Sequence, residues 1–434
     1  MIGIIIASII IVFSLLLVLR MPVAFAFGLV GFLGICYLEG IQKAFVALYT
    51  IPFSQISNYV WVTLPLYVLF GELASNTKLT TDFFTGARAW LGHVKGGILH
   101  AIIVGNAAFG ACCGVSLAAA SSFTGICLPE SRKYDYSDEP VLGAVCGSSS
   151  LSTLIPPSTG MVMFGILTQT SISELFIAGL IPGLILTILF MGAALFVAVR
   201  NPKAVPLAPK ASRREKGLGL LKMIPLAIIF IILIGGLYFG LFTPTEGAGV
   251  SVIVVIILGL IRRTLNWGGV KDSMLKTIRM AVSTLFLLAG TMIFNSYLTL
   301  TGFGNILSNG ISQITNSPIG FMLIVAIIMV ILGMFIDVAP LSMLLVPLLF
   351  PISRKFGVDP VQFGVIWVML GATGTVSPPF GVVTYTVGRL VPEIPIMKIF
   401  KATYPYMIMI LAIILILMFI PQVSLILVNA MRTY

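Results

Sequence analysis

Long apolar segments run through this chain from one end to the other. Runs of about 17 or more mostly apolar residues recur, which is the length that an α-helix needs to cross the hydrocarbon core of a bilayer. Only 9% of the 434 residues are charged and 59% are hydrophobic, whereas soluble domains average about 25% charged residues. The sequence therefore predicts an all-α polytopic membrane protein that is surrounded by a lipid bilayer.

Ten spans are predicted from these runs, five in each half of the chain. They cover 2–19, 22–38, 59–76, 139–169 and 177–199, and then 221–241, 246–263, 281–300, 361–388 and 400–420. Two further apolar segments, 98–128 and 319–350, carry Gly, Asn, Ser, Asp or Pro near their centres. We interpret each as a re-entrant hairpin that enters and leaves on one side of the membrane. A long tilted helix is the alternative.

The midpoint of the chain is polar and basic. Arg200 to Gly217 reads RNPKAVPLAPKASRREKG, and we interpret 200–220 as a linker between two halves, 1–199 and 221–434. Seven identities recur 222 residues apart, namely Pro129, Ser131, Arg132, Lys133, Thr153, Pro156 and Pro157 with Pro351, Ser353, Arg354, Lys355, Thr375, Pro378 and Pro379. The halves are therefore predicted to be repeats. Because each has an odd number of spans, the second repeat should be inverted relative to the first.

The basic residues agree with this layout. With the linker in the cytoplasm, all but four of the 25 Lys and Arg residues fall on the cytoplasmic side. This follows the positive-inside rule and places both termini in the periplasm. The net charge of +11 is then explained by topology, and no binding of nucleic acid is expected.

Two motifs interrupt predicted spans with paired prolines. They read STLIPPSTG, Ser152 to Gly160, and GTVSPPFG, Gly374 to Gly381. Unpaired backbone groups at membrane depth are costly, so such breaks persist only where something satisfies them. The carbonyls that end one half-helix suit a cation such as Na⁺, and the N–H groups that begin the next suit a carboxylate. We therefore predict a binding site near the membrane midplane at the two breaks.

Uncharged oxygen donors gather beside these prolines. The Ser and Thr hydroxyls of GSSSLSTLIPPST and of GATGTVS suit Na⁺ better than a transition metal, which prefers His or Cys. Helix packing is the alternative explanation for any single hydroxyl. Asp337, the acidic residue of a predicted hairpin core, is a candidate cation ligand or else a structural hydrogen-bonding group. Asn106 is a weaker candidate, because interhelical packing explains it equally well.

Enzymatic machinery has no counterpart in the sequence. There is no GxxxxGK[ST] motif for ATP hydrolysis and no HExxH motif for a metalloprotease. An intramembrane aspartyl enzyme would need two deep carboxylates, and a serine enzyme would need a base beside its nucleophile. Asp337 is the one deep acidic residue that we predict, and the two histidines, His93 and His100, lie near one membrane edge. We therefore expect no catalytic residues and no covalent cofactor, and an intramembrane enzyme is a remote alternative.

Four segments together resemble the large membrane subunit of tripartite ATP-independent periplasmic (TRAP) transporters. They are TLPLYVLFGELA from Thr63, STLIPPSTGMVMFG from Ser152, GLIPG from Gly179 and GMFIDVAPLSMLLVPLLFP from Gly333. The resemblance implies a secondary active transporter of the bacterial inner membrane, which imports a small carboxylate with Na⁺ by an elevator mechanism. It also implies two partners, a small four-helix membrane subunit and a soluble periplasmic binding protein.

The resemblance further implies Na⁺ sites between each hairpin tip and the neighbouring break. The candidate Na⁺ ligands are Gly114, Ser149, Ser150, Ser152, Thr153, Gly333, Asp337, Thr373, Gly374 and Thr375. The candidate substrate-binding residues are Asn106, Ser116, Pro156, Pro157, Ser158, Ser377, Pro378 and Pro379.

Two positions depart from the family pattern. Family members often have an acidic residue just after the first hairpin tip and another before the second Pro-Pro pair, where this chain has Ala118–Ala120 and Ala372. The number of coupling ions and the substrate are therefore left open. A stand-alone Na⁺- or H⁺-coupled anion carrier that needs no binding protein is the alternative function.

Overall fold

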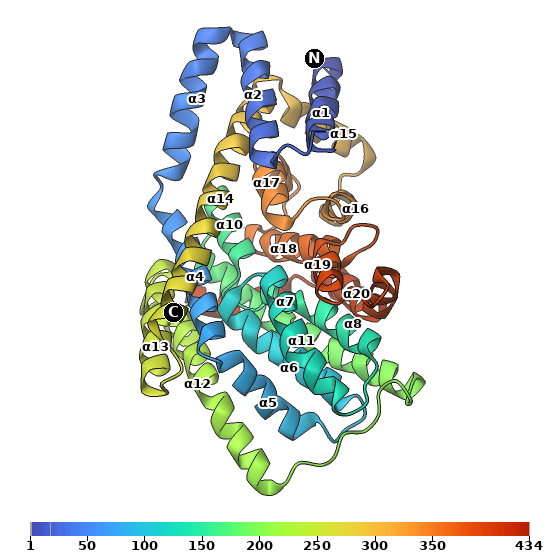
Figure 1. Ribbon diagram of the computed structural model, residues 1–434. Helices are drawn as coiled ribbons and strands as arrows, with labels where there is room; N and C mark the ends of the chain where they lie inside the picture. Colours follow the sequence, from blue (N-terminus) through green and yellow to red (C-terminus); the bar gives the residue numbers. More distant parts are fainter. Residues whose placement is uncertain (1, 18, 434) are drawn as a thin grey trace.

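The regular structure of the described residues is entirely helical (Figure 1). The computed structural model describes residues 2–17 and 19–433; Met1, Val18 and Tyr434, which belong to the predicted repeats 1–199 and 221–434, lie outside this description. The first half contains α1 (Ile2–Leu17), α2 (Val23–Glu39), α3 (Ile41–Ile56), η1 (Tyr59–Val62), α4 (Thr63–Asn76), α5 (Leu79–Leu91), α6 (Gly97–Cys113), α7 (Ser116–Arg132), α8 (Asp138–Ser149), α9 (Leu151–Leu154), α10 (Thr159–Thr168) and α11 (Ile172–Arg200). The second half contains α12 (Arg213–Tyr238), α13 (Pro244–Ile261), α14 (Trp267–Leu300), α15 (Phe303–Ile314), α16 (Pro318–Gly333), α17 (Val338–Lys355), α18 (Pro360–Val376), α19 (Val382–Leu390), α20 (Ile396–Phe419) and α21 (Gln422–Thr433).

Seven of the described helical segments are long and apolar enough to cross a membrane. They are α8–α10 taken together, α11, α12, α13, α14, α17 and α20, and the pair α15–α16, which is bent by 118°, is an eighth candidate. This is fewer than the ten predicted spans. The predicted spans 22–38, 59–76 and 361–388 are not among the candidates, because α2 and α18 have 17 residues each, just short of the others, and α4 has 14.

The order of helices recurs in the two halves. In each half, two helices joined by a short tip are followed by a helix with a break and then by a long helix, α11 or α20. The first hairpin begins at Gly97 and the second at Pro318, 221 residues later, while the broken helices begin at Asp138 and Pro360, 222 residues apart. A duplicated unit would give this order. The inversion of one half across the membrane stays a prediction.

The linker between the halves is shorter than predicted. Of the predicted linker 200–220, residues 201–212 are non-helical, whereas Arg200 ends α11 and 213–220 belong to α12. The cause is a capping box, in which Ser212 Oγ accepts from the Glu215 N–H at 3.2 Å and Glu215 Oε2 accepts from the Ser212 N–H at 2.7 Å. The S-x-x-E pattern at this place is a helix-start signal.

Helix α14 is continuous over 34 residues. The predicted span over 281–300 is the C-terminal part of this helix, which begins at Trp267. An ion pair one turn apart, Asp272 with Lys276 at 2.8 Å, supports the helix through its polar first part. The structure also contains a helix that the sequence analysis does not predict, α3.

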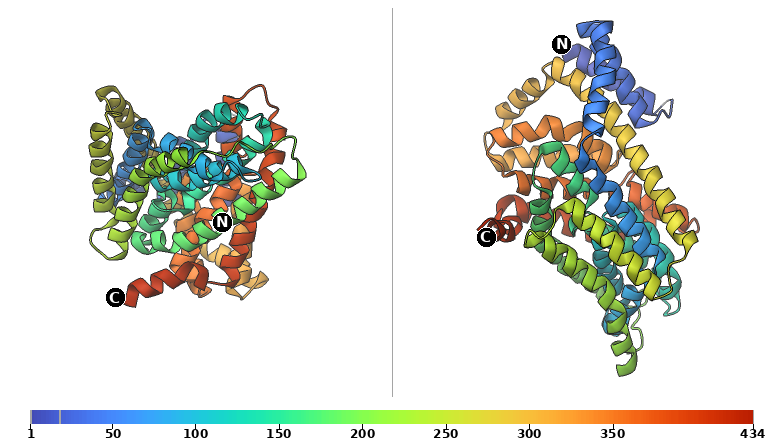
Figure 2. Two further views of the ribbon diagram at one scale, coloured as in Figure 1. Left: turned by 90° about the horizontal axis from the view of Figure 1, so that it is seen from below. Right: turned by 90° about the vertical axis from the view of Figure 1, so that its left-hand side faces the viewer.

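Helices α2, α3, α4 and α14 pack along one another on one side of the molecule (Figures 1 and 2). Glycine permits the closest approach between α2 and α14: a Cβ on Gly31 would lie 2.7 Å from Phe294 Cα, and a Cβ on Gly290 would collide with the carbonyl of Ala24. Small residues at such crossings let helix backbones approach closely in a membrane. We call α2, α3, α4, α13 and α14 the outer helices, of which α2, α3 and α4 pack on α14 and α13 packs on α4.

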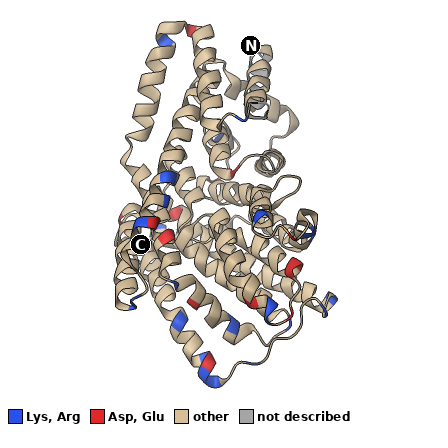
Figure 3. Ribbon diagram, viewed as in Figure 1, with Lys and Arg blue, Asp and Glu red and all other residues tan. Residues whose placement is uncertain are grey.

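The largest buried apolar cluster runs through the hairpins and the broken helices. Charged residues lie mostly at helix ends and in loops, and the central parts of α14 and α18 carry almost none (Figure 3). The first break is largely buried in this apolar part of the fold, whereas Pro379 and Phe380 of the second break are exposed.

Candidate functional site

Each Pro-Pro motif ends one helix and precedes another. In the first half, α9 ends at Leu154 and α10 begins at Thr159; in the second half, α18 ends at Val376 and α19 begins at Val382. The peptide bonds Pro156–Pro157 and Pro378–Pro379 are both cis. Proline removes a backbone donor and cannot continue a helix, so carbonyls of the preceding turn lose their partners. The predicted broken helices 139–169 and 361–388 agree in position with α8–α10 and α18–α19.

The first hairpin tip contacts the first break directly. The predicted hairpin 98–128 corresponds to α6 and α7, whose tip is Gly114 and Val115. The Gly114 carbonyl accepts from the Thr159 N–H at 3.2 Å and from Thr159 Oγ1 at 2.8 Å. Gly114 has a φ of +59°, and a Cβ on it would lie 2.5 Å from the Pro157 carbonyl oxygen. Only glycine adopts this conformation and this closeness without strain.

The second hairpin tip contacts the second break through glycine. The predicted hairpin 319–350 corresponds to α16 and α17, which are joined by residues 334–337. A Cβ on Gly374 would lie 2.6 Å from Gly333 Cα, so the two backbones touch. A Cβ on Gly371, one turn earlier, would lie 2.8 Å from Val338 Cγ1. The predicted pairing of each hairpin with the break of its own half is therefore found in both halves.

The candidate hydroxyls are buried and share one bonding pattern. Each donates its proton to a backbone carbonyl three or four residues earlier in the chain, at 2.5–2.9 Å. They are Ser149, Ser150, Ser152, Thr153, Thr373 and Thr375. A hydroxyl that donates its proton in this way keeps its oxygen lone pairs free to accept a bond or to coordinate a cation. These hydroxyl oxygens could therefore coordinate a cation. Their hydrogen bonds are also complete without one.

Asp337 lies at the hairpin tip rather than within a hairpin helix. It is the N-cap of α17, where its Oδ1 accepts from the Val338 N–H at 2.8 Å. The Asp337 side chain is exposed in this chain by itself. Its depth in the membrane and its role as a cation ligand stay predictions.

Asn106 links the first hairpin to the first broken helix. Its Nδ2 donates to Ser148 Oγ at 2.7 Å and to the Val145 carbonyl at 3.4 Å. Its buried Oδ1 has no hydrogen-bond partner among the described residues. An unsatisfied buried acceptor is costly, so Asn106 offers one oxygen for a cation or for a donor on the substrate.

The remaining candidate substrate residues cap or flank the breaks. Ser116 begins α7 and is buried, and Ser158 is the N-cap of α10, where its Oγ accepts from the Met161 N–H at 3.3 Å. Ser377 Oγ donates to the Thr373 carbonyl at 2.6 Å and also lies 3.2 Å from Met407 Sδ. Pro156, Pro157, Pro378 and Pro379 form the breaks themselves.

Two helix N-termini meet at the first tip. α7 begins at Ser116 and α10 at Thr159, and the hydrogen bonds from Thr159 to Gly114 hold these two starts together. Helix N-termini carry partial positive charge and unpaired N–H groups. No Lys or Arg lies in either tip or either break. An anion here would therefore be stabilised by helix ends and by neighbouring cations rather than by a basic side chain.

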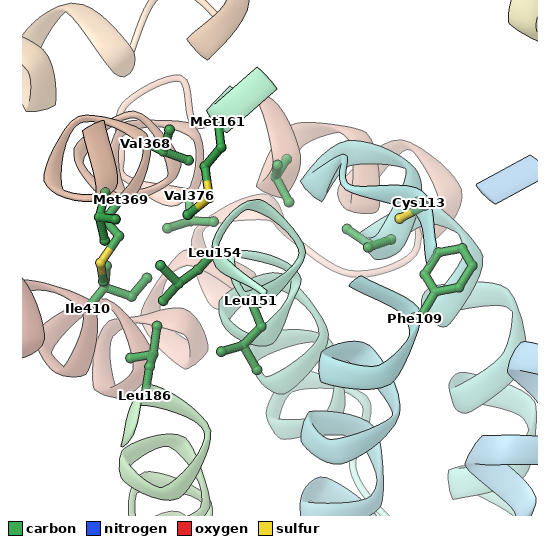
Figure 4. Packing of buried hydrophobic residues seen from close by; sticks show 14 of the residues in the cluster. Phe109, Cys113, Leu151, Leu154, Met161, Leu186, Val368, Met369, Val376 and Ile410 are labelled. Carbon is green, nitrogen blue, oxygen red and sulfur yellow. The ribbon is translucent and has the colours of Figure 1, made fainter. Parts of the chain in front are cut away.

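The two breaks are neighbours. α9 and α10 contact α18, α10 contacts α17, and α7 contacts α19. Figure 4 shows Leu151 and Leu154 of α9 in one apolar cluster with Val376 of α18 and Ile410 of α20. The hydroxyl and carbonyl groups of both halves are thus brought together by a common apolar core.

Thr159, one of the hydroxyls of GSSSLSTLIPPST, and Gly110 are not among the candidate ligands predicted by number, although both join tip and break. A Cβ on Gly110 would lie 2.6 Å from Ser152 Cα. The signal for Thr159 was present, since it directly follows Ser158 after the proline pair. Ala119 and Ala372, where the family pattern often has acidic residues, are buried. These positions therefore belong to the packed core.

The family described as "Tripartite ATP-independent periplasmic transporter, DctM component" matches residues 10–423. The C4-dicarboxylate TRAP transporter large permease protein DctM of Pseudomonas aeruginosa is 29% identical over 378 residues, which cover 87% of this chain and 88% of that protein. The sialic acid TRAP transporter large permease protein SiaM of Vibrio cholerae is 30% identical over 415 residues, which cover 95% of this chain and 96% of that protein.

Two further comparisons agree. The ectoine/5-hydroxyectoine TRAP transporter large permease protein UehC of Ruegeria pomeroyi is 30% identical over 366 residues, which cover 84% of this chain and 85% of that protein. The crystal structure of the Alcanivorax borkumensis YdaH transporter matches with a TM-score of 0.63 at 14% identity and covers 88% of both chains. At this identity the match concerns the fold alone.

Proposed function

Because this chain belongs to the DctM family of tripartite ATP-independent periplasmic transporters, we propose that it imports a small carboxylate together with Na⁺. The family consists of transporter permease subunits, so the chain is a multi-pass membrane transport protein and not an enzyme. The relatives are named for C4-dicarboxylates, sialic acid and ectoine. A carboxylate is the chemical feature that these substrates share, and we propose it as the group recognised here.

The observation that carries the proposal is the contact between each hairpin tip and its break. These contacts put buried hydroxyl and carbonyl oxygens beside helix N-termini, as in Thr159 with Gly114 at 2.8 Å and Gly374 against Gly333. Oxygen donors without positive charge suit Na⁺, and helix N-termini suit a carboxylate. Na⁺ and the substrate would then neutralise one another in a site that has no basic side chain.

Coupling to Na⁺ is energetically reasonable for such a substrate. One charge that moves through 100 mV yields about 2.3 kcal/mol, which is about 1.7 decades of concentration. A carboxylate that enters the cell moves against the inside-negative potential. At least two Na⁺ ions per carboxylate are therefore expected, one for each hairpin and break.

An elevator movement is proposed because the helices fall into two groups. The hairpins and broken helices pack on one another through α7, α8, α10, α18 and α20, while α2, α3 and α4 pack along α14 and α13 packs on α4. In the proposal the first group carries the site across the membrane against the second. The small membrane subunit would support the outer helices, and a periplasmic binding protein would deliver substrate to a transporter in the bacterial inner membrane.

The test is uptake into proteoliposomes that contain this chain with its small membrane subunit and binding protein. A panel of a C4-dicarboxylate, sialic acid and ectoine should identify a substrate whose uptake requires an inward Na⁺ gradient and rises with an inside-negative potential. Uptake that continues unchanged when Na⁺ is replaced by K⁺ would contradict Na⁺ coupling. Equal uptake without the binding protein would favour a stand-alone carrier.

A further inference from the structure

A charged cleft lies where α8, α11 and α20 meet, away from both hairpin tips. Its volume is about 400 Å³. The first turn of α8 contributes Glu139, the last turn of α11 contributes Phe196 and Arg200, and the first turns of α20 contribute Lys398 and Lys401. Neither the tip contacts nor the proposed transport mechanism uses these residues.

The cleft has more cations than it can pair internally. Lys398 Nζ lies 3.2 Å from Glu139 Oε1, and this carboxylate is the one acidic group of the lining. The Arg200 guanidinium lies over the Phe196 ring, 5.8 Å from its centroid. Lys401 is exposed and makes no ion pair with any of the described residues. The lining therefore carries a net charge of two positive units, which an anion can neutralise.

The position of the cleft relates it to the membrane surface. α11 and α20 are both candidate spans, and the cleft lies at the last turn of one and the first turn of the other. Their outward faces are apolar for several turns away from the cleft; the exposed residues include Leu184, Ile188, Leu195, Tyr404, Ile408 and Leu411. A ligand here thus meets cations at the membrane edge and an apolar, lipid-facing surface directly beside them.

We propose that this cleft binds the phosphate headgroup of an anionic membrane phospholipid, whose acyl chains lie along α11 and α20. Basic pockets between membrane helices are sites of this kind, and Lys and Arg stems pack on apolar surface while their charges reach an interface. A free phosphate ester would satisfy the same cations. It would leave the apolar faces without a partner, however, and for this reason the lipid is the ligand that we infer. The inference requires a membrane position only and does not rest on the proposed transport.

Native mass spectrometry of the full chain in detergent tests the proposal. The protein is mixed separately with phosphatidylglycerol, phosphatidylcholine and sn-glycerol 3-phosphate, and the retained ligand is counted. Wild type should retain phosphatidylglycerol in preference to phosphatidylcholine. Each Lys near an anionic headgroup contributes about fivefold in affinity, so Lys398→Gln with Lys401→Gln should weaken retention by roughly 25-fold. Lys401→Gln alone, which breaks no ion pair, should weaken it by about fivefold.

The matched control is Lys203→Gln with Lys210→Gln in the non-helical linker, which removes the same charge outside the cleft. Retention in this control should equal that of wild type. Equal retention of phosphatidylcholine, unchanged retention in the cleft variants, or an equal loss in the control would each overturn the proposal. Competition by sn-glycerol 3-phosphate as effective as that by the intact lipid would show a site for soluble anions instead.

Discussion

Gly374 and Gly333 touch backbone to backbone, and this contact fixes the second hairpin tip against the second break. A Cβ on Gly374 would lie 2.6 Å from both the Cα and the carbonyl carbon of Gly333. Distances this short do not occur between real atoms of this kind, and the obstacle is backbone, which cannot rotate away. The two segments must separate if Gly374 gains a side chain.

Gly374→Ala should therefore impair Na⁺-dependent uptake while leaving membrane insertion intact. The added methyl group would push the tip from the break and spread the proposed cation ligands. We expect a loss of at least tenfold in apparent Na⁺ affinity, since misplacement of the order of 1 Å is felt strongly at preorganised sites. Gly249→Ala in α13 is the control, because no atom lies within 4 Å of the added Cβ there. Equal activity of both variants would show that the contact does not position the site.

Thr159→Val tests the hydrogen bond that joins the first tip to the first break. Valine keeps the side-chain shape and removes the donor to the Gly114 carbonyl. A single hydrogen bond contributes about 1 kcal/mol, so apparent Na⁺ or substrate affinity should fall about fivefold. Amide hydrogen exchange around Gly114 should become faster. Thr187→Val is the control, since Thr187 donates within α11, to the Gly183 carbonyl. An equal loss of affinity in this control would show that the bond from Thr159 to Gly114 has no specific role in the site.

Asp337→Asn separates the charge of this residue from its role as a helix cap. Asn caps helix N-termini about as well as Asp, so thermal stability should stay within about 0.5 kcal/mol of wild type. If Asp337 binds Na⁺, the Na⁺ concentration for half-maximal uptake should rise severalfold. Asp359→Asn is the matched control, because Asp359 caps α18 far from the break, through the N–H groups of Val361 and Gln362. Unchanged Na⁺ dependence in Asp337→Asn would exclude its carboxylate as a ligand.

Gly290→Ala should weaken the packing between the outer helices without changing the residues of the candidate site. Its methyl group would collide with the Ala24 carbonyl where α14 crosses α2. Overpacking of this kind costs typically about 1–3 kcal/mol, which should lower the midpoint of thermal unfolding in detergent. Gly235→Ala in α12 has open space around the new methyl group and should match or exceed wild-type stability. A midpoint for Gly290→Ala equal to that of Gly235→Ala would contradict the proposed close packing.

The sequence predicts the hairpins and breaks well because their signals are local. Paired prolines end a helix wherever they occur, and glycine clusters such as the one around Gly114 mark places of close approach. Hydrogen bonds between distant residues cannot be predicted in this way. No local pattern shows that Thr159 donates to the Gly114 carbonyl, 45 residues away. The exposure of the Asp337 side chain likewise depends on the packing of the hairpin tip, which no local sequence pattern shows. The early start of α12 could have been predicted from Ser212 and Glu215.

The continuity of α14 has a mechanical consequence. A helix of 34 residues is about 51 Å long, whereas the hydrocarbon core is about 30 Å thick. Roughly a dozen residues must then project into the headgroup region or the water, or the helix must lean far over. Its charged residues, Lys271, Asp272, Lys276 and Arg279, all fall within the first thirteen positions of the helix, counted from Trp267, which favours projection. The N-terminal part of α14 would then lie outside the membrane and continue without a break into the part that spans it. A displacement of this outer end would be transmitted directly to the membrane-spanning part.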